Sequence, residues 1–276
     1  GNVENDYRNN LIFDYVRMAM ELRPLFILME NVPGLKNGRG KAIFKKATNE
    51  LAENYILTND VLNCADYGIP QTRKRLVLHG IRNDVYKILK NNNPEFKVSL
   101  PVATHTADPT THPGLQKWCT SAGAFQNLPP VAAGAPAPVG YPNHETHGIQ
   151  YIHQNGGTRT CLPENLQLPC HRNGRANYTD VYGIIDPHQP APTITGGCIT
   201  FSKGRYGHPS QNRAITVREA ARLQSFRDDF VFYGSRGQTA LQVGNAVPPM
   251  LAEASGRYFL SLLNILHQIP AAEDPS

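Results

Sequence analysis

An apolar run that stops at an acidic residue constrains the fold of this chain more than any other feature. Leu25 to Met29 are apolar at every position, which is typical of a strand buried on both faces of a sheet. Helical periodicity precedes this run over residues 11–22 and follows it over 41–54, and strand-like segments then occupy 55–62 and 75–81. This alternation of helix and strand predicts an α/β fold with a doubly wound sheet.

The composition changes at about residue 95 and again at about residue 205. The stretch from 101 to 200 holds 13 of the 22 prolines and 11 of the 23 glycines, and regular periodicity disappears there. Such a stretch predicts a loop-rich region, and loops on a rigid scaffold are frequent sites of recognition. We therefore expect residues 1–94 and 206–276 to form the α/β domain, and residues 95–205 to form a second, irregular domain.

The charge and the hydropathy of the chain narrow the class of protein. Lys and Arg exceed Asp and Glu by 27 to 22, and residues 71–97 alone hold seven basic and two acidic side chains. Such a cluster is either a solvated surface or a binding face for a polyanion. No stretch reaches the roughly 18 apolar residues of a membrane span. With five cysteines and no metal-type spacing, we expect a cytoplasmic protein that holds no metal.

Three side chains are candidates for binding or catalysis in the first part of the chain. Glu30 follows the apolar run, at the strand end where open α/β sheets place ligands. Partial burial raises the pKa of a carboxyl there and lets it donate a proton near neutrality, although a capping or arginine-paired acid would look the same. Arg73 and Arg75 alternate on an extended segment, so they are expected to face one side. Two such groups suit a phosphate and a nearby carbonyl oxygen, and solvated edge arginines are the alternative.

A turn near the C-terminus is a further candidate for ligand binding. Gly244 and Asn245 lead into Pro248, Pro249 and a helix predicted over 250–267. Proline is common at a helix start, and the free amides of a first helical turn bind polar ligand groups. A plain turn before a helix would give the same sequence.

Other chemically suggestive residues carry weaker signals. Gly38 and Gly40 precede a helix, but a lone Gly-x-Gly lacks the fuller fingerprint of a nucleotide loop. Cys170 and His171 resemble a nucleophile with its base, yet they lie in the irregular region, where a structural or surface cysteine is expected. The scattered histidines show no metal-ligand spacing. None of these is predicted to be a site.

Six segments occur in one particular order along the chain. They are residues 6–13, 30–32, 62–70, 71–75, 218–224 and 244–249. In this order they resemble the fifth to tenth motifs of the DNA cytosine-5 methyltransferases, the bacterial or phage modification type of restriction-modification systems in particular. The resemblance covers most of residues 6–263. It implies a partial Rossmann-like methyltransferase sheet with a target-recognition domain at 95–205.

The resemblance also implies an activity and a set of site residues. The family transfers a methyl group from S-adenosylmethionine to C5 of a cytosine that is flipped out of double-stranded DNA. Glu30 would hydrogen-bond or protonate the ring at N3 and bind the exocyclic amine, Arg75 would bind O2, and Arg73 would hold a nearby phosphate. The residues implied at the cofactor are Leu11, Asn245, Ala246 and Val247. The residues implied at the DNA, with glycines that permit close approach, are Gln71, Arg73, Thr193, Thr195, Gly196 and Gly197.

Two parts of the family pattern are not among these 276 residues. They are the nucleophilic cysteine of a Pro-Cys-Gln segment and an earlier glycine loop. Three interpretations remain open: a piece of a single-chain methyltransferase, a C-terminal subunit whose separate N-terminal half supplies the nucleophile, or a non-catalytic DNA-binding module. The first two predict no methylation by this chain alone. Because the family packs the C-terminal helix near the glycine-loop strand, we also expect open apolar surface and self-association.

Overall fold

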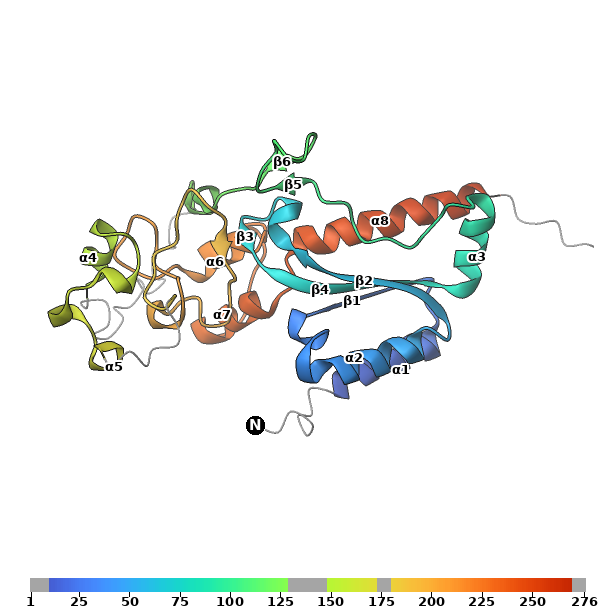
Figure 1. Ribbon diagram of the computed structural model, residues 1–276, viewed down its shortest axis with the longest axis horizontal. Helices are drawn as coiled ribbons and strands as arrows, with labels where there is room; N and C mark the ends of the chain where they lie inside the picture. The colour runs from blue at the N-terminus through green and yellow to red at the C-terminus, as the bar shows by residue number, and fades with distance from the viewer. Residues whose placement is uncertain (1–9, 129–147, 173–179, 270–276) are drawn as a thin grey trace, which may run out of the picture. The chain divides into compact units, whose positions relative to one another are not determined.

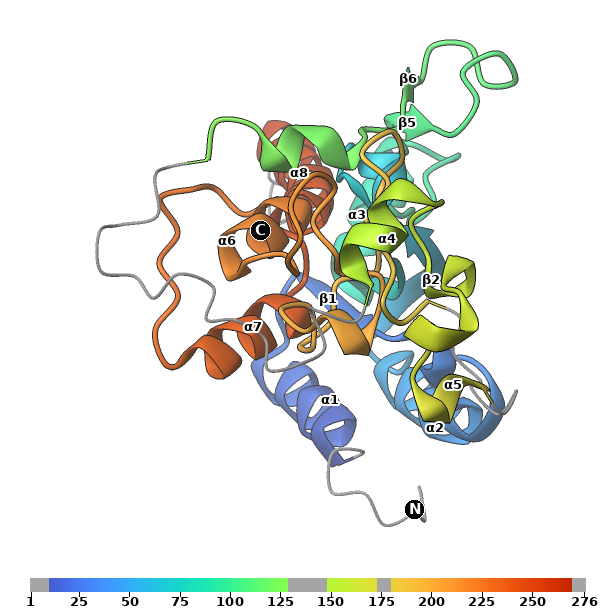
Figure 2. The same ribbon diagram turned by 90° about the vertical axis from the view of Figure 1, so that its left-hand side faces the viewer.

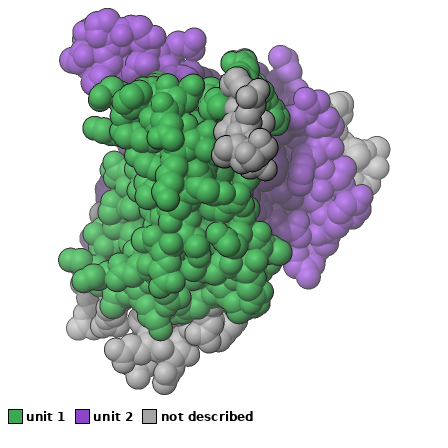
Figure 3. All heavy atoms as spheres, turned by 90° about the vertical axis from the view of Figure 1, so that its right-hand side faces the viewer, with its two compact units in different colours: residues 1–63, 74–103, 252–276 green, residues 64–73, 104–251 purple. Residues whose placement is uncertain are grey.

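The structure, a computed structural model, describes residues 10–128, 148–172 and 180–269. Two compact units divide the chain, and Figure 3 shows them in different colours. Unit 1 comprises residues 1–63, 74–103 and 252–276, and unit 2 comprises residues 64–73 and 104–251. Residues 206–251 thus belong to the same compact unit as most of the irregular region. The functional division into ranges 1–94, 95–205 and 206–276 stays a prediction.

A three-stranded sheet forms the centre of unit 1 (Figure 1). Its strands are β1 (Phe26–Asn31), β2 (Tyr55–Asn63) and β4 (Lys74–Arg82), in the order β1-β4-β2. β4 runs antiparallel to both neighbours, with Asn63 opposite Lys74. The connection from β2 to β4 contains no α-helix, and a parallel return would need a crossover of a dozen or more residues.

Helices cover both faces of this sheet, as a doubly wound fold requires (Figure 1). α1 (Asn10–Leu22) and α2 (Lys41–Leu51) pack on one face, around a buried cluster that includes Ile27, Met29, Leu76 and Leu78. α3 (Asn83–Asn92) and α8 (Pro249–Gln268) pack around Ile81 and Phe26. The predicted α/β class is confirmed, and sequence analysis missed only α3 among these helices.

β1 is less buried than its run of apolar residues predicted. Ile27 and Met29 are buried, but Leu28 is 38% exposed and Leu25, just before the strand, is 37% exposed. β1 lies at the edge of the sheet, and within the described residues β4 is the one strand paired with it. The prediction of a strand buried on both faces is therefore wrong for this part of the chain, because no described strand covers the outer edge.

Unit 2 contains little regular structure, as its proline and glycine content predicted (Figures 1 and 2). Its strands are two-residue pairs: β3 (Gln71–Thr72) with β7 (Ala191–Pro192), and β5 (His105–Thr106) with β6 (Gln116–Lys117). Its helices are α4 (Ile149–Gln154), α5 (Pro169–Arg172), α6 (Val217–Leu223) and α7 (Arg236–Asn245). A buried cluster that includes Ile185, Ile194, Ile215, Leu223 and Val243 forms its main core. None of the described helices in either unit is long and apolar enough to cross a membrane.

A buried carboxylate fixes the start of α6. Glu219 is 1% exposed, accepts hydrogen bonds of 2.6 and 2.8 Å from Arg213, and accepts one of 2.7 Å from the Thr216 amide. The Thr216 Oγ1 in turn accepts a bond from the Glu219 amide, which completes a capping box. Burial acts to raise the pKa of Glu219, but the bonds from Arg213 and Thr216 outweigh it and hold the pKa below its ordinary value.

Candidate functional site

Glu30 and Arg75 form an ion pair in unit 1. Arg75 Nε lies 2.9 Å from Glu30 Oε1, and the two side chains are 13% and 20% exposed. The strand register explains the pairing: Glu30 lies opposite Val77, so Arg75 is its diagonal neighbour on the same face of the sheet. The pair presents a carboxylate acceptor beside guanidinium donors, with a small part of each open to solvent. An acid paired with an arginine was one alternative that the sequence left open for Glu30.

Arg73 binds the protein's own backbone in unit 2. The residue is 1% exposed, its Nη1 donates to the carbonyl of Ile194 at 2.7 Å, and its Nη2 donates to the carbonyls of Gly244 and Ala246 at 2.9 and 3.1 Å. Arg73 and Arg75 therefore do not act as a pair, because Arg75 forms its ion pair with Glu30. This geometry does not support the phosphate contact predicted for Arg73. The side chain instead ties the segment after β7 to the turn that ends α7.

Gln71 has a similar inward role. The residue is fully buried, and its Oε1 accepts a 2.8 Å bond from the Ile194 amide. Its Nε2 donates to the Leu223 carbonyl and to Gln224 Oε1, both at 3.1 Å. These partners all lie in unit 2, so a direct DNA contact by Gln71 is not supported either. Gln71 and Arg73 both bind the backbone of Ile194. Ile194 lies in residues 189–197, a segment that resembles the family's second recognition loop and is called the recognition-loop candidate below.

The hydroxyl groups of this loop are also bonded within the protein. Thr193 Oγ1 donates to the Thr72 carbonyl at 3.1 Å, and Thr195 Oγ1 lies 2.9 Å from the hydroxyl of Tyr206. The Tyr206 hydroxyl in turn donates to the Thr193 carbonyl at 3.1 Å. Burial raises the pKa of Tyr206, so its hydroxyl stays protonated and keeps donating. The loop is thus held in a fixed shape, and DNA contacts by Thr193 and Thr195 stay a prediction.

The glycines of the loop allow close packing within the protein, in addition to the approach to DNA that the sequence predicted. A Cβ at Gly196 would meet Leu241 Cδ1 at 2.6 Å, and a Cβ at Gly244 would meet the Gly196 amide nitrogen at 2.1 Å. Gly196 and Gly244 therefore let α7 approach the loop closely. A Cβ at Gly197 would meet the stem of Lys203 at 3.0 Å. Sequence analysis assigned such glycines to DNA alone, and that assignment stays untested.

The residues implied at the cofactor occupy accessible positions. Leu11, in the first turn of α1, is 62% exposed, and Asn245, the last residue of α7, is exposed. Ala246 and Val247 are half-buried. An apolar side chain and an exposed amide are the groups that bind an adenosine-containing ligand. Leu11 belongs to unit 1 and the turn to unit 2, and their roles at the cofactor stay a prediction.

The basic cluster of residues 71–97 is smaller in the structure than in the sequence. Arg73 is buried, Arg75 pairs with Glu30, and Arg82 pairs with Asp84 at 2.7 Å. The cluster's exposed cations are the lysines Lys74, Lys87 and Lys97. Phosphate affinity at this cluster would therefore come from lysines and not from the arginines that suggested it.

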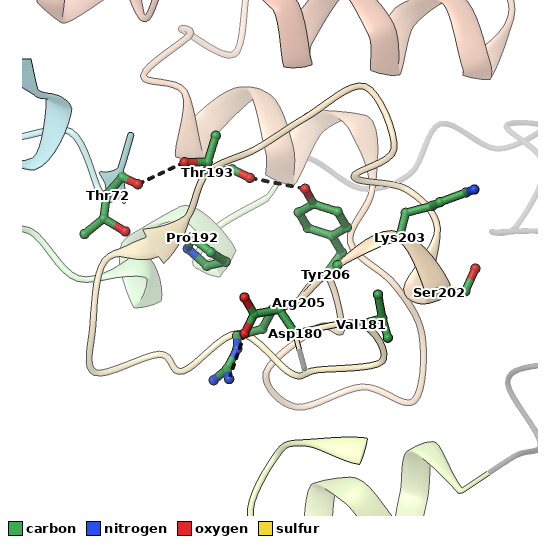
Figure 4. Close-up of a pocket in the computed structure, with 10 residues that line it drawn as sticks. Thr72, Asp180, Val181, Pro192, Thr193, Ser202, Lys203, Arg205 and Tyr206 are labelled. Carbon is green, nitrogen blue, oxygen red and sulfur yellow. Dashed lines mark hydrogen bonds and ion pairs between the residues drawn. The ribbon is translucent and has the colours of Figure 1, made fainter. Parts of the chain in front are cut away.

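Unit 2 holds a cavity of about 710 Å³ beside the recognition-loop candidate (Figure 4). Its lining comes from four segments of the unit: Thr72; Asp180 and Val181; Pro192 and Thr193; and residues 202–206. Sequence analysis missed Lys203 and Arg205 in this lining. Two cations separated by a glycine in an irregular segment give no periodic signal. The fold, and not a local pattern, brings them near residues 192 and 193.

Comparison with known proteins identifies relatives over nearly the whole chain. The model of the C-5 cytosine-specific DNA methylase family matches residues 2–260. The chain is 33% identical over 268 residues to Type II methyltransferase M1.HphI of Haemophilus parahaemolyticus, covering 94% of this chain and 62% of the relative. It is 32% identical over 267 residues to Type II methylase M.HgiDII of Herpetosiphon aurantiacus, covering 94% and 71%. The chain thus spans about three fifths of the first relative.

Solved structures of methyltransferases share the fold. The Entamoeba histolytica methyltransferase EhMeth matches with a TM-score of 0.56 and 15% identity, over 95% of this chain and 70% of that one. The Dnmt2 methyltransferase of S. pombe matches with a TM-score of 0.53 and 14% identity, over 93% and 74%. These likenesses confirm the predicted Rossmann-like methyltransferase fold. The match of the family model over residues 2–260 shows that this chain belongs to the C-5 cytosine-specific DNA methylase family.

Proposed function

We propose that this chain is the part of a type II DNA cytosine-5 methyltransferase that binds the target cytosine and recognises the surrounding DNA. The observation that carries the proposal is the 2.9 Å pair of Glu30 and Arg75, in a chain of this family. The substrate is cytosine in double-stranded DNA, flipped out of the duplex to reach the pair. S-adenosylmethionine would supply the methyl group, and the family resemblance implies Leu11 and, separately, the turn at residues 245–247 as residues that would bind it.

Glu30 and Arg75 act on the pyrimidine edge. C5 of cytosine is a poor nucleophile, and addition of a thiolate at C6 makes C5 reactive. Glu30 hydrogen-bonds the exocyclic amine and the protonated N3, while Arg75 donates to O2. Both contacts strengthen as addition pushes electron density into the ring, so they stabilise the transition state more than the bound base. The existing ion pair keeps both groups in position before the base arrives.

The thiolate comes, in this proposal, from a Pro-Cys-Gln segment outside these 276 residues. That segment belongs either to the same longer polypeptide or to a separate N-terminal half. The edge of β1 supports such an addition, since among the described residues β4 alone pairs with it. An edge strand with apolar side chains is a template for pairing with a further strand. Leu11, Met18 and Leu22 on α1 add exposed apolar surface in the same unit.

A methyl-transfer assay with tritiated S-adenosylmethionine on mixed-sequence DNA tests the proposal. The chain is assayed alone and with a polypeptide that carries the family's glycine loop and Pro-Cys-Gln segment. Activity is expected only in the mixture, and Glu30→Gln should lower it at least about 100-fold, the usual cost of losing one transition-state hydrogen bond. Glu21→Gln, in an exposed pair with Arg17, is the matched control and should leave the rate unchanged.

Two outcomes would count against the proposal. Methyl transfer by the chain alone would show that the nucleophile lies within these residues, with Cys170 the first candidate to substitute. Silence in both assays, with DNA binding retained, would favour the non-catalytic DNA-binding module.

A further inference from the structure

The cavity of unit 2 has the size of a nucleotide site. Its volume of about 710 Å³ lies in the range of roughly 300–1,000 Å³ that small-molecule pockets occupy. In Figure 4, Arg205 and Asp180 lie toward one end of the space, and Thr72 and Thr193 toward the other. Pro192 and Tyr206 lie between them. The walls therefore combine an apolar middle with a charged end.

Two cations in the lining face a single acid. Arg205 Nη2 lies 3.7 Å from Asp180 Oδ1, and the Asp180 side chain is 76% exposed. An exposed pair at this distance contributes little, because water screens it. Among the residues that the structure describes, this is the one polar contact of the Arg205 guanidinium, and the Lys203 ammonium has none. Both cations thus keep donors for a ligand.

The hydroxyl groups of Thr72, Thr193 and Tyr206 in the wall are already bonded to the protein, and Thr72 Oγ1 donates to the Ala191 carbonyl. Thr193 Oγ1 donates to the Thr72 carbonyl, and the Tyr206 hydroxyl donates to the Thr193 carbonyl. These bonds stiffen the wall, and the cations Lys203 and Arg205 are its charged donors for a ligand. The ligand must therefore offer acceptors.

Close packing positions the stems of both cations. A Cβ at Gly183 would meet Arg205 Cγ at 2.9 Å, and a Cβ at Gly197 would meet Lys203 Cβ at 3.0 Å. The backbone beneath is tied as well, since the Gly207 amide donates to the Gly183 carbonyl at 2.8 Å. Side chains held in this way lose less entropy on binding than free surface cations do.

We propose that this cavity holds a segment of one DNA strand, with Arg205 donating to N7 and O6 of a guanine and Lys203 to a phosphate. The planar fork of arginine matches the two acceptors of guanine, whereas an ammonium is a point charge suited to phosphate. Arg205 is then a specificity-determining residue, and Gly183 positions it. This inference rests on the proposed function, because it names the side chains through which the chain selects its DNA.

Binding by the 276-residue chain tests the inference without catalysis. Selection from a random duplex library gives the preferred sequence, and anisotropy titrations over a range of salt give the affinity. Arg205→Ala and Arg205→Lys should relax the preference for guanine at one position and weaken binding to the selected duplex about 10- to 100-fold. Lys203→Ala should weaken binding to all duplexes alike and reduce the salt slope by about 1.

Two further variants separate recognition from folding and from charge. Gly183→Ala leaves the guanidinium intact but displaces the Arg205 stem, so it should relax the preference at the same position. Arg227→Ala is the matched control, because Arg227 lies outside the cavity in an exposed pair with Asp229. Its selected sequence should equal that of the unmodified chain.

The outcomes distinguish this inference from the proposed function. A guanine preference that survives Arg205→Ala overturns the inference, and the role of Glu30 then stands on the methyl-transfer assay. Absence of DNA binding by the unmodified chain also overturns it, whatever that assay shows. A selected sequence without guanine would do so too.

Discussion

Arg73 donates a 2.7 Å hydrogen bond from Nη1 to the backbone carbonyl of Ile194, a residue 121 positions further along the chain. Its Nη2 reaches the carbonyls of Gly244 and Ala246. One side chain thus holds together segments from three distant parts of unit 2, and one of these segments contains residues implied at the cofactor. Arg73 therefore fixes the position of the Gly244–Ala246 turn relative to the segment at Ile194.

Substitution of Arg73 should destabilise unit 2. Arg73→Ala leaves two buried carbonyls and one part-buried carbonyl without their donor. We expect a loss of roughly 2–5 kcal/mol in the free energy of unfolding, because each buried acceptor left unsatisfied costs about 1–3 kcal/mol. Arg73→Lys keeps the charge but replaces the planar fork, so most of the loss should remain. Urea denaturation followed by intrinsic fluorescence measures it. Unchanged unfolding of both variants with weaker DNA binding would instead support the phosphate contact predicted from sequence.

Two glycines of α7 provide a matched test of backbone packing. A Cβ at Gly244 would lie 2.1 Å from the Gly196 amide nitrogen, whereas a Cβ at Gly237 meets nothing within 4 Å. Gly244→Ala should force α7 from the loop and cost about 1–3 kcal/mol or more, as overpacking does. Gly237→Ala should stabilise the helix by about 0.5–1 kcal/mol. Equal melting temperatures for the two variants would contradict this account of the Gly244 turn.

Sequence periodicity located the elements of unit 1 other than α3, because their cores are built from local patterns. The predicted strand 55–62 ends one residue before β2 does. The predicted strand 75–81 and the predicted helix 250–267 are each one residue shorter at both ends than β4 and α8. The burial of β1 was overestimated, because an apolar run does not reveal whether a neighbouring strand is present. The apolar run also predicted correctly that Glu30 lies near the end of a strand.

The site residues of unit 2 were harder to predict. Alternation placed Arg73 and Arg75 on one face, but β3 ends at Thr72 and β4 begins at Lys74, so the alternation is interrupted between them. The partners of Arg73 lie 121 to 173 residues away, and no local pattern encodes such contacts. Lys203 and Arg205 were missed for the same reason. Long-range hydrogen bonds position the irregular segments, and such bonds cannot be predicted from composition.

The stability of unit 1 should depend on pH through His79. The ring is fully buried, Nδ1 lies 3.0 Å from the Ser99 carbonyl, and Nε2 lies 3.1 Å from Ser255 Oγ. Burial lowers the pKa of His79 to about 4. Between about pH 6.5 and 4 the unfolded chain therefore binds more protons, and stability falls as pH decreases through this window and levels off below it. The expected loss is on the order of 3 kcal/mol.

Urea titrations between pH 7.5 and 4 measure this dependence. His79→Gln should be less stable than the unmodified chain at pH 7 but should show a flatter pH profile. His112→Gln, at an exposed position, is the matched control and should keep the original profile. A profile equally steep in His79→Gln would assign the pH dependence to other groups.

Exposed apolar side chains on α1 should make the isolated chain self-associate. Leu11, Met18 and Leu22 are 62%, 50% and 73% exposed, and their spacing of seven and four residues places them along one stripe of the helix. Ile12, Val16 and Ala19 fill the buried stripe, so these three have no described core to enter. Met18→Glu with Leu22→Glu should shift the chain toward monomer in sedimentation experiments without lowering its melting temperature. Val102→Glu, which charges an equally exposed residue outside α1, should leave self-association unchanged. A monodisperse monomer before any substitution would contradict the idea that this stripe is a contact surface.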